Sequence, residues 1–131
     1  MIVLDTHVLV WWVNGGPALS ARARREIRAA LAAGPLRVSA ISAFEIAAAV
    51  RRGRLEIGLP LEQWWTELVR LPELRFEPVT EELARIAGSF DDVAPSDPAD
   101  RLIAATAIAL GARLVTADEK LRRFAQVQTV W

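Results

Sequence analysis

The segment SDPADRLIAATAIALGARLVTADEKL, residues 96–121, decides which fold this sequence can adopt. Pro98 suits the first turn of a helix that runs to Gly111, and residues 113–116 have the pattern of a short buried strand. A helix that leads within a few residues into a buried strand is typical of parallel α/β folds. Aspartates at positions 97, 100 and 118 interrupt this otherwise apolar or small-residue segment, so their presence needs an explanation.

The same alternation of short apolar runs and helical segments continues through the rest of the chain. Strands are expected at residues 2–4, 36–39, 74–79, 113–116 and 127–130. Helices are expected at residues 6–14, 21–33, 42–52, 60–71, 80–88, 98–111 and 119–124. We therefore predict an α/β protein with one domain over residues 1–131, in which a central, mostly parallel sheet lies between helices in a three-layer α/β/α arrangement.

The composition narrows the possible functions. The chain has 131 residues, of which 53% are hydrophobic, and this suits one well-filled core. A formal net charge of zero argues against a protein that grips duplex nucleic acid. The lack of cysteine excludes disulfides, thiolate zinc sites and cysteine nucleophiles, and it fits a reducing compartment such as the cytoplasm. We expect no membrane association, since the apolar stretch at residues 102–112 is too short to span a bilayer.

Two of the acidic residues follow predicted strands. Asp5 comes directly after the strand at residues 2–4, and Asp118 follows the strand at 113–116. Ligands of open α/β sheets bind outside the carboxyl ends of the strands, which is where these carboxylates would meet. Each aspartate could instead be a simple N-cap of the next helix. Thr6 would supply a supporting hydroxyl beside Asp5.

Two further acids lie in the first turns of predicted helices. Ser42 and Glu45 have the spacing of a capping box, in which Glu45 would bond back to the helix start. Alternatively, Glu45 lies at the sheet edge beside an apolar helix wall. Asp97 suits the N-cap before Pro98, whereas Asp100 faces the same side as small residues that allow close packing.

Taken together, the acids at strand–helix junctions predict a cation site. Carboxylates gathered at one sheet edge repel one another unless a cation compensates them. Mg²⁺ prefers carboxylate ligands together with water and substrate phosphate. We therefore expect metal-assisted phosphodiester hydrolysis, carried out by Asp5, Glu45, Asp100 and Asp118.

Four segments, each of which carries one of these acids, resemble a known family. They are MIVLDTHVLVWW at residues 1–12, SAISAFEIAAAVRRGRL at 39–55, DPADRLIAATA at 97–107 and ARLVTADEKL at 112–121. In this order they are similar to PIN-domain proteins, and more narrowly to VapC-type ribonuclease toxins of toxin–antitoxin pairs. The resemblance covers nearly the whole chain.

The resemblance implies a Mg²⁺- or Mn²⁺-dependent endoribonuclease that is inhibited by a VapB-like antitoxin and forms a homodimer. The family's acidic residues correspond to Asp5, Glu45, Asp100 and Asp118, and we expect the first, third and fourth of them to hold the metal. Thr6, Thr116 and Asp97 are expected to support them. The alternative is a non-catalytic PIN-like scaffold that binds RNA or protein, but such a protein would be expected to have lost at least one acid.

The roles of one histidine and two tryptophan pairs stay open at this point. His7 could be a general base or a metal ligand, although a lone histidine at a helix start more often packs or forms hydrogen bonds. Neighbours on a helix point about 100° apart, so one member of each pair, Trp11–Trp12 and Trp64–Trp65, could be exposed at an interface. Equally, all four rings could close the edge of the core.

Overall fold

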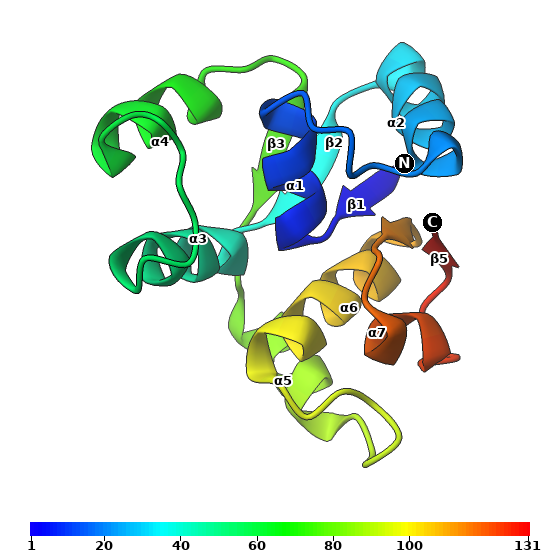
Figure 1. Ribbon diagram of the computed structural model, residues 1–131. Helices are drawn as coiled ribbons and strands as arrows, with labels where there is room; N and C mark the ends of the chain where they lie inside the picture. The colour runs from blue at the N-terminus through cyan, green and yellow to red at the C-terminus, as the bar shows by residue number, and fades with distance from the viewer.

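The computed structural model describes residues 1–131, and its centre is a five-stranded sheet with the order β3-β2-β1-β4-β5 (Figure 1). Every pair of neighbouring strands is parallel, which confirms the predicted sheet. The strands are β1 (Ile2–Leu4), β2 (Leu36–Ser39), β3 (Leu74–Glu77), β4 (Arg113–Val115) and β5 (Thr129–Val130).

Seven helices connect and cover the strands. They are α1 (Thr6–Val13), α2 (Ala21–Ala33), α3 (Ile41–Arg51), α4 (Leu61–Val69), α5 (Glu81–Ser89), α6 (Pro98–Leu110) and α7 (Glu119–Arg123). Each corresponds to a helix predicted from the sequence, with ends that differ by at most two residues. No helix has both the length and the apolar character that crossing a membrane would require.

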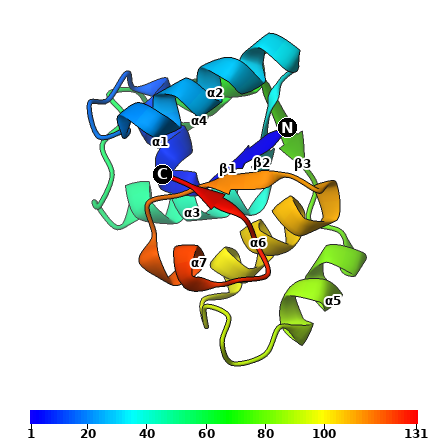
Figure 2. The same ribbon diagram turned by 90° about the vertical axis from the view of Figure 1, so that its right-hand side faces the viewer.

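The helices form two layers because successive side chains of each strand point to opposite faces of the sheet. Ile2 and Leu4 of β1 belong to one core, which packs against α1, α2 and α4, whereas Val3 belongs to a second core with α6 and α7. Figure 2 shows α1, α2 and α4 above the sheet, with α5, α6 and α7 below it. The three-layer prediction is therefore confirmed.

Polar residues at the helix ends explain where several helices begin and end. The Ser20 hydroxyl accepts a hydrogen bond from the amide of Ala23, and Thr80 does the same for Leu83, so both residues cap a helix as expected from their type. Gly111 ends α6 with a φ of 61°, in the left-handed region where glycine has no steric penalty.

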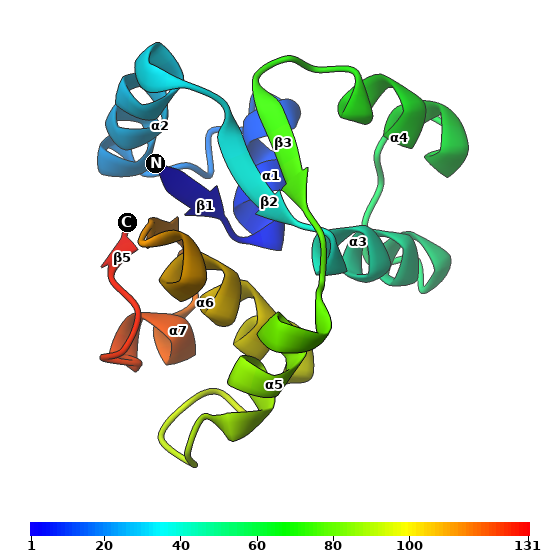
Figure 3. The same ribbon diagram turned by 180° about the vertical axis from the view of Figure 1, so that it is seen from behind.

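The order of the strands creates a crevice beside β1. After β1 the chain builds β2 and β3 on one side, with β3 at the outer edge (Figure 3), and then returns to build β4 and β5 on the other side. The carboxyl ends of the strands next to such a reversal are where open α/β sheets bind ligands. Because Leu4 is paired with Val115, the residues that follow β1 and β4 emerge side by side at this crevice.

The tryptophan pairs close the edge of the core. Trp64 is buried and the other three rings are half-buried against the core beside α1, α2 and α4. Trp11 lies 5.8 Å from Trp131, and Trp65 lies 5.2 Å from Phe76, measured between ring centroids. Of the two interpretations left open for these pairs, the one in which all four rings close the edge of the core is therefore confirmed, and elements distant in sequence cover the rings.

A single arginine holds the connection between α5 and α6. The guanidinium group of Arg101 donates hydrogen bonds to the backbone carbonyls of Ala87, Phe90, Asp91 and Pro95, at distances between 2.7 and 3.2 Å. Ala87 lies in the last turn of α5 and the other three carbonyls lie in the connection that follows it, so the arginine supplies hydrogen-bond donors where the helix ends and no regular structure provides them.

We expect Arg101→Ala to lower the free energy of unfolding by about 2 kcal/mol, because it leaves several carbonyls without a charged donor. Urea unfolding followed by circular dichroism would measure the change. Arg85→Ala is the matched control, since the ion pair of Arg85 with Glu81 is exposed and should contribute less than about 1 kcal/mol. Equal effects of the two substitutions would contradict this role of Arg101.

Candidate active site

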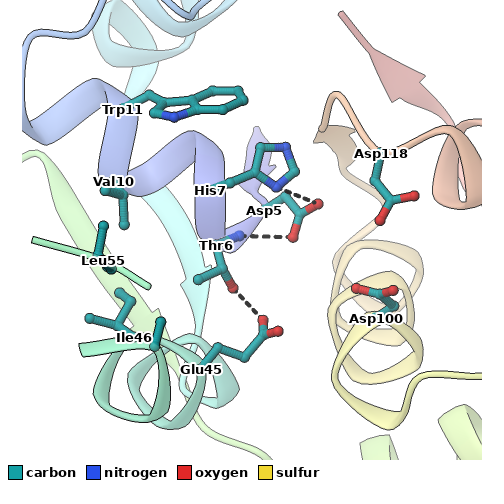
Figure 4. A pocket seen from close by; sticks show the side chains of 11 residues that line it. Asp5, Thr6, His7, Val10, Trp11, Glu45, Ile46, Leu55, Asp100 and Asp118 are labelled. Atoms are coloured by element: carbon teal, nitrogen blue, oxygen red, sulfur yellow. Dashed lines mark hydrogen bonds and ion pairs between the residues drawn. The ribbon is translucent and has the colours of Figure 1, made fainter. Parts of the chain in front are cut away.

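A pocket of about 340 Å³ opens at the carboxyl ends of β1 and β4 (Figure 4). One part of its wall is apolar and includes Trp11 and Leu55, while the remainder is mainly acidic. The structure brings to this pocket all four acids that the sequence predicted, from four separate segments of the chain: Asp5, Glu45, Asp100 and Asp118.

Asp5 is buried, and its orientation is set by two hydrogen bonds. Its Oδ1 accepts from the amide of Thr6 at 2.8 Å, and its Oδ2 accepts from the hydroxyl of Thr116 at 2.6 Å. Asp5 is thus the N-cap of α1 and also part of the pocket wall. The helix-cap interpretation and the site interpretation of this residue are therefore both correct.

Thr116 connects the loops that carry Asp5 and Asp118. While its hydroxyl donates to Asp5, the same oxygen accepts a hydrogen bond from the amide of Asp118 at 3.0 Å. Thr116 is fully buried, so this bridge is shielded from water. Asp118 in turn caps α7, because its Oδ1 accepts from the amide of Lys120 at 2.8 Å.

Glu45 is held by a side-chain network and not by a capping box. Helix α3 begins at Ile41 without any side-chain cap, so the predicted pairing of Ser42 with Glu45 at the helix start is wrong. Instead, Thr6 donates its hydroxyl hydrogen to Oε1 of Glu45 at 2.5 Å. The Thr6 hydroxyl has one hydrogen, which this bond uses. In the bond between Thr6 and the buried Ser42, at 2.8 Å, the Ser42 hydroxyl is therefore the donor.

Ser42 is therefore a site residue whose role sequence reasoning missed. Ser42 and Glu45 are three residues apart and lie on the same face of α3, which is the spacing that suggested the capping box. The same spacing also allows both side chains to reach one external partner. Only the packing of α1 against α3 shows that this partner is Thr6.

The opposite wall of the pocket carries Asp100, in the first turn of α6, and Asp118 (Figure 4). Asp97 is the N-cap of α6, since its carboxylate accepts from the amide of Asp100 at 3.0 Å, and this confirms its predicted structural role. Asp97 does not line the pocket, yet its charge acts on the pocket, as the pKa values of two nearby acids show.

The pocket concentrates negative charge. Partial burial is the largest cause that raises the pKa of Asp100, and together with the charges of Asp5, Asp97, Asp118 and Glu45 it brings this pKa to about 7. Burial also raises the pKa of Glu45, against the hydrogen bond from Thr6, which lowers it. The protein by itself thus leaves its acids poorly compensated, as expected where a cation is to bind.

The carboxylates face one another across the pocket from two walls, and no three His, Cys, Asp or Glu side chains are spaced closely enough to hold an ion as they stand. They are more widely spread than the packed cluster expected from the sequence. The donor set nevertheless fits Mg²⁺ or Mn²⁺, since Mg²⁺ commonly binds through one or two carboxylates and keeps several waters.

Comparison with known proteins places the chain in a family. The model of the PIN domain matches residues 2–127. The chain belongs to the PIN-domain family. This PIN domain is 39% identical over 132 residues to Ribonuclease VapC22 of Mycobacterium tuberculosis (strain ATCC 25618 / H37Rv), and the match covers 99% of this chain and 98% of the relative. The resemblance to VapC-type proteins that the sequence predicted is thereby confirmed.

Solved structures share the fold of this PIN domain at low identity. VapBC2 from Rickettsia felis, bound to a DNA fragment from its promoter, matches with a TM-score of 0.71 and 22% identity, over 99% of this chain and 98% of the other. FitAcB from Neisseria gonorrhoeae matches with a TM-score of 0.69 and 24% identity, over 100% and 97% of the two chains. These likenesses support the three-layer fold.

The raised pKa of Asp100 predicts how this residue affects stability without metal. Since the folded state holds the proton more tightly than the unfolded state, the stabilising contribution is present at low pH and lost as the pH rises through about 7. Asp100→Asn should therefore stabilise the metal-free protein at about pH 8 by about 1 kcal/mol after solvent screening, and by less at about pH 5.

Urea unfolding in EDTA across this pH range would measure the difference. Asp92→Asn is the control, because Asp92 is exposed in the connection just before α6 and outside the pocket. A stability difference between Asp100→Asn and wild type that does not change with pH would contradict the prediction.

Proposed function

We propose that this PIN domain is a metal-dependent endoribonuclease that hydrolyses RNA phosphodiester bonds. The convergence of four carboxylates on one pocket carries the proposal, because four segments far apart in the chain each contribute one acid: Asp5, Glu45, Asp100 and Asp118. Its similarity to a relative named as a ribonuclease supports the choice of RNA. The proposed substrate is single-stranded or looped RNA, because proteins that recognise RNA sequence mostly contact unpaired bases.

The cofactor in this proposal is Mg²⁺ or Mn²⁺, held by Asp5, Asp100 and Asp118. Such an ion supplies Lewis acidity, which activates water and stabilises negative charge on the phosphate and the leaving oxygen. Asp100 and Asp118 lie on the wall of the pocket across from Asp5 (Figure 4). Asp5 cannot rotate freely, because Thr116 and the amide of Thr6 hold its two oxygens.

Glu45 is the residue best suited to move a proton. Thr6 holds its Oε1, whereas its Oε2 has no hydrogen bond within the protein and is free to accept a proton from an attacking water. Its raised pKa brings the carboxylate closer to the range in which it can both accept and release a proton. Thr6 therefore orients the base in this proposal, and Ser42 orients Thr6.

A VapB-like antitoxin is the proposed protein partner, and the proposed assembly of this chain is a homodimer in the cytoplasm. The likeness to structures described as VapBC2 and as a toxin–antitoxin complex supports the antitoxin. A non-catalytic scaffold is less well supported, since all four acids are present and line one pocket.

We expect the purified protein to cleave single-stranded RNA with Mg²⁺ or Mn²⁺ and to lose this activity in EDTA. Asp5→Asn and Asp100→Asn should each lower the cleavage rate by at least about 100-fold, because each removes a charged ligand from the pocket. Asp92→Asn, an exposed acid outside the pocket, should retain wild-type cleavage. A gel assay with labelled RNA measures all of these rates.

Cleavage that persists in EDTA would overturn the metal dependence. Cleavage at wild-type rate in both Asp5→Asn and Asp100→Asn would show that the pocket is not the active site. Complete absence of cleavage across a broad set of RNAs, with folded protein and Mn²⁺ present, would favour the non-catalytic scaffold.

Adding the cognate antitoxin should suppress cleavage as the two proteins reach equal amounts, because its binding would block access to the pocket. The same titration followed by sedimentation would give the mass of the complex. The protein alone should sediment at twice the 14.4 kDa of one chain. Undiminished cleavage in the presence of bound antitoxin would contradict the proposed inhibition.

A further inference from the structure

His7, the only histidine of the chain, lies between the two loops that carry Asp5 and Asp118. Its Nε2 accepts a hydrogen bond from the amide of Ala117 at 3.2 Å, and its Nδ1 lies 3.5 Å from Oδ2 of Asp5. The ring also packs edge-on against Trp11, with a centroid distance of 4.8 Å and an angle of 64°. Two neighbours on its own helix, the N-cap Asp5 and Trp11, and one distant residue, Ala117, therefore hold the imidazole.

These contacts decide which nitrogen carries the proton. A backbone amide can only donate, so Nε2 must offer its lone pair to Ala117. In a neutral imidazole the proton is then on Nδ1, which faces the carboxylate of Asp5 (Figure 4). Nε2 accepts from Ala117 and Nδ1 carries the proton beside Asp5, so in this arrangement neither nitrogen has a free lone pair for a metal ion or for a proton from water.

The loop that His7 contacts is held by single hydrogen bonds and not by a strand or a helix. Residues 116–118 lie between β4 and α7 and have no regular secondary structure. Thr116 is tied to β5 through its amide and to Asp5 through its hydroxyl. Ala117 comes next, and its amide is bonded to His7. Asp118 follows directly; its amide donates to the Thr116 hydroxyl and its carboxylate accepts from the amide of Lys120, so His7 adds the contact that fixes the middle of this loop against α1.

We infer that His7 is a positioning residue that holds the loop of Asp118 against Asp5 and thereby sets the spacing of these two carboxylates for a divalent ion. The inference rests on the proposed function. No three acids are spaced to hold an ion as they stand, so ion binding requires the carboxylates to come closer together, and His7 fixes the backbone from which the Asp118 side chain reaches toward Asp5. Residues that orient metal ligands in this way typically contribute about 10–100-fold to metal affinity or activity.

Two substitutions of His7 distinguish a positioning residue from a metal ligand and from a general base. In His7→Gln, the side-chain oxygen can take the place of Nε2 and accept from the amide of Ala117, whereas His7→Leu keeps apolar packing against Trp11 but has no acceptor. We expect His7→Leu to weaken Mn²⁺ binding by about 10–100-fold and His7→Gln to stay close to wild type. Isothermal titration calorimetry measures the affinities, after circular dichroism has shown that both variants are folded.

RNA cleavage then distinguishes positioning from direct catalysis. If His7 only positions the loop, saturating Mn²⁺ restores most of the cleavage rate of His7→Leu. Equal Mn²⁺ affinity in wild type, His7→Gln and His7→Leu would overturn the inference. So would loss of cleavage in both variants that saturating Mn²⁺ does not restore, since this is the behaviour of a general base.

The contact itself can be tested without metal or RNA. Because the chain has one histidine, its nitrogen resonances in an NMR spectrum are unambiguous, and we expect an unprotonated Nε2 and a protonated Nδ1. The Ala117 amide should exchange slowly in wild type and His7→Gln, and rapidly in His7→Leu. The opposite tautomer, or unprotected exchange in wild type, would overturn the inference. A wild-type protein that shows the contact but binds no Mn²⁺ would instead contradict the proposed function.

Discussion

The parallel pairing of β1 with β4 is the constraint on which the rest of this structure depends. The two strands come from opposite ends of the chain, and their register sets Leu4 beside Val115. The amide of Asp5 continues the ladder by donating to the carbonyl of Val115, so Asp5 and Thr116 leave the sheet next to each other. A shift of one residue would turn the side chains to the opposite faces and separate Asp5 from Thr116.

Carboxylates of like charge repel one another at the ends of β1 and β4. Burial, and after it the charges of neighbouring acids, raise the pKa values of Asp100 and Glu45, so these two carboxylates oppose the stability of the metal-free fold when they are ionised. Neutral donors, and not cations, orient the carboxylates: Thr116 and the amide of Thr6 bond Asp5, and the hydroxyl of Thr6 bonds Glu45. The negative charge is thus held in place without being neutralised, which leaves it available for an external cation and a phosphate substrate.

Much of the fold and the acidic set could be predicted because both rest on local patterns. Short apolar runs, Ser20 and Thr80 as caps, and Gly111 as a helix end all act within a few residues, so the order and type of elements followed from them. The four acids stood out because each follows a strand or opens a helix. The Ser42–Glu45 spacing misled for the same reason, since a local pattern fits both a capping box and a shared distant partner.

By itself, then, the sequence determined the alternation of strands and helices, the α/β class and the identity of the acids, because these depend on neighbouring residues. Only the tertiary structure decided which hydroxyl holds which carboxylate, how widely the acids are spread and what His7 contacts. The links Thr6–Glu45, Thr116–Asp5 and Ala117–His7 join residues between 39 and 111 positions apart. Such contacts exist only once the sheet has brought distant segments together, so no local pattern in the chain encodes them.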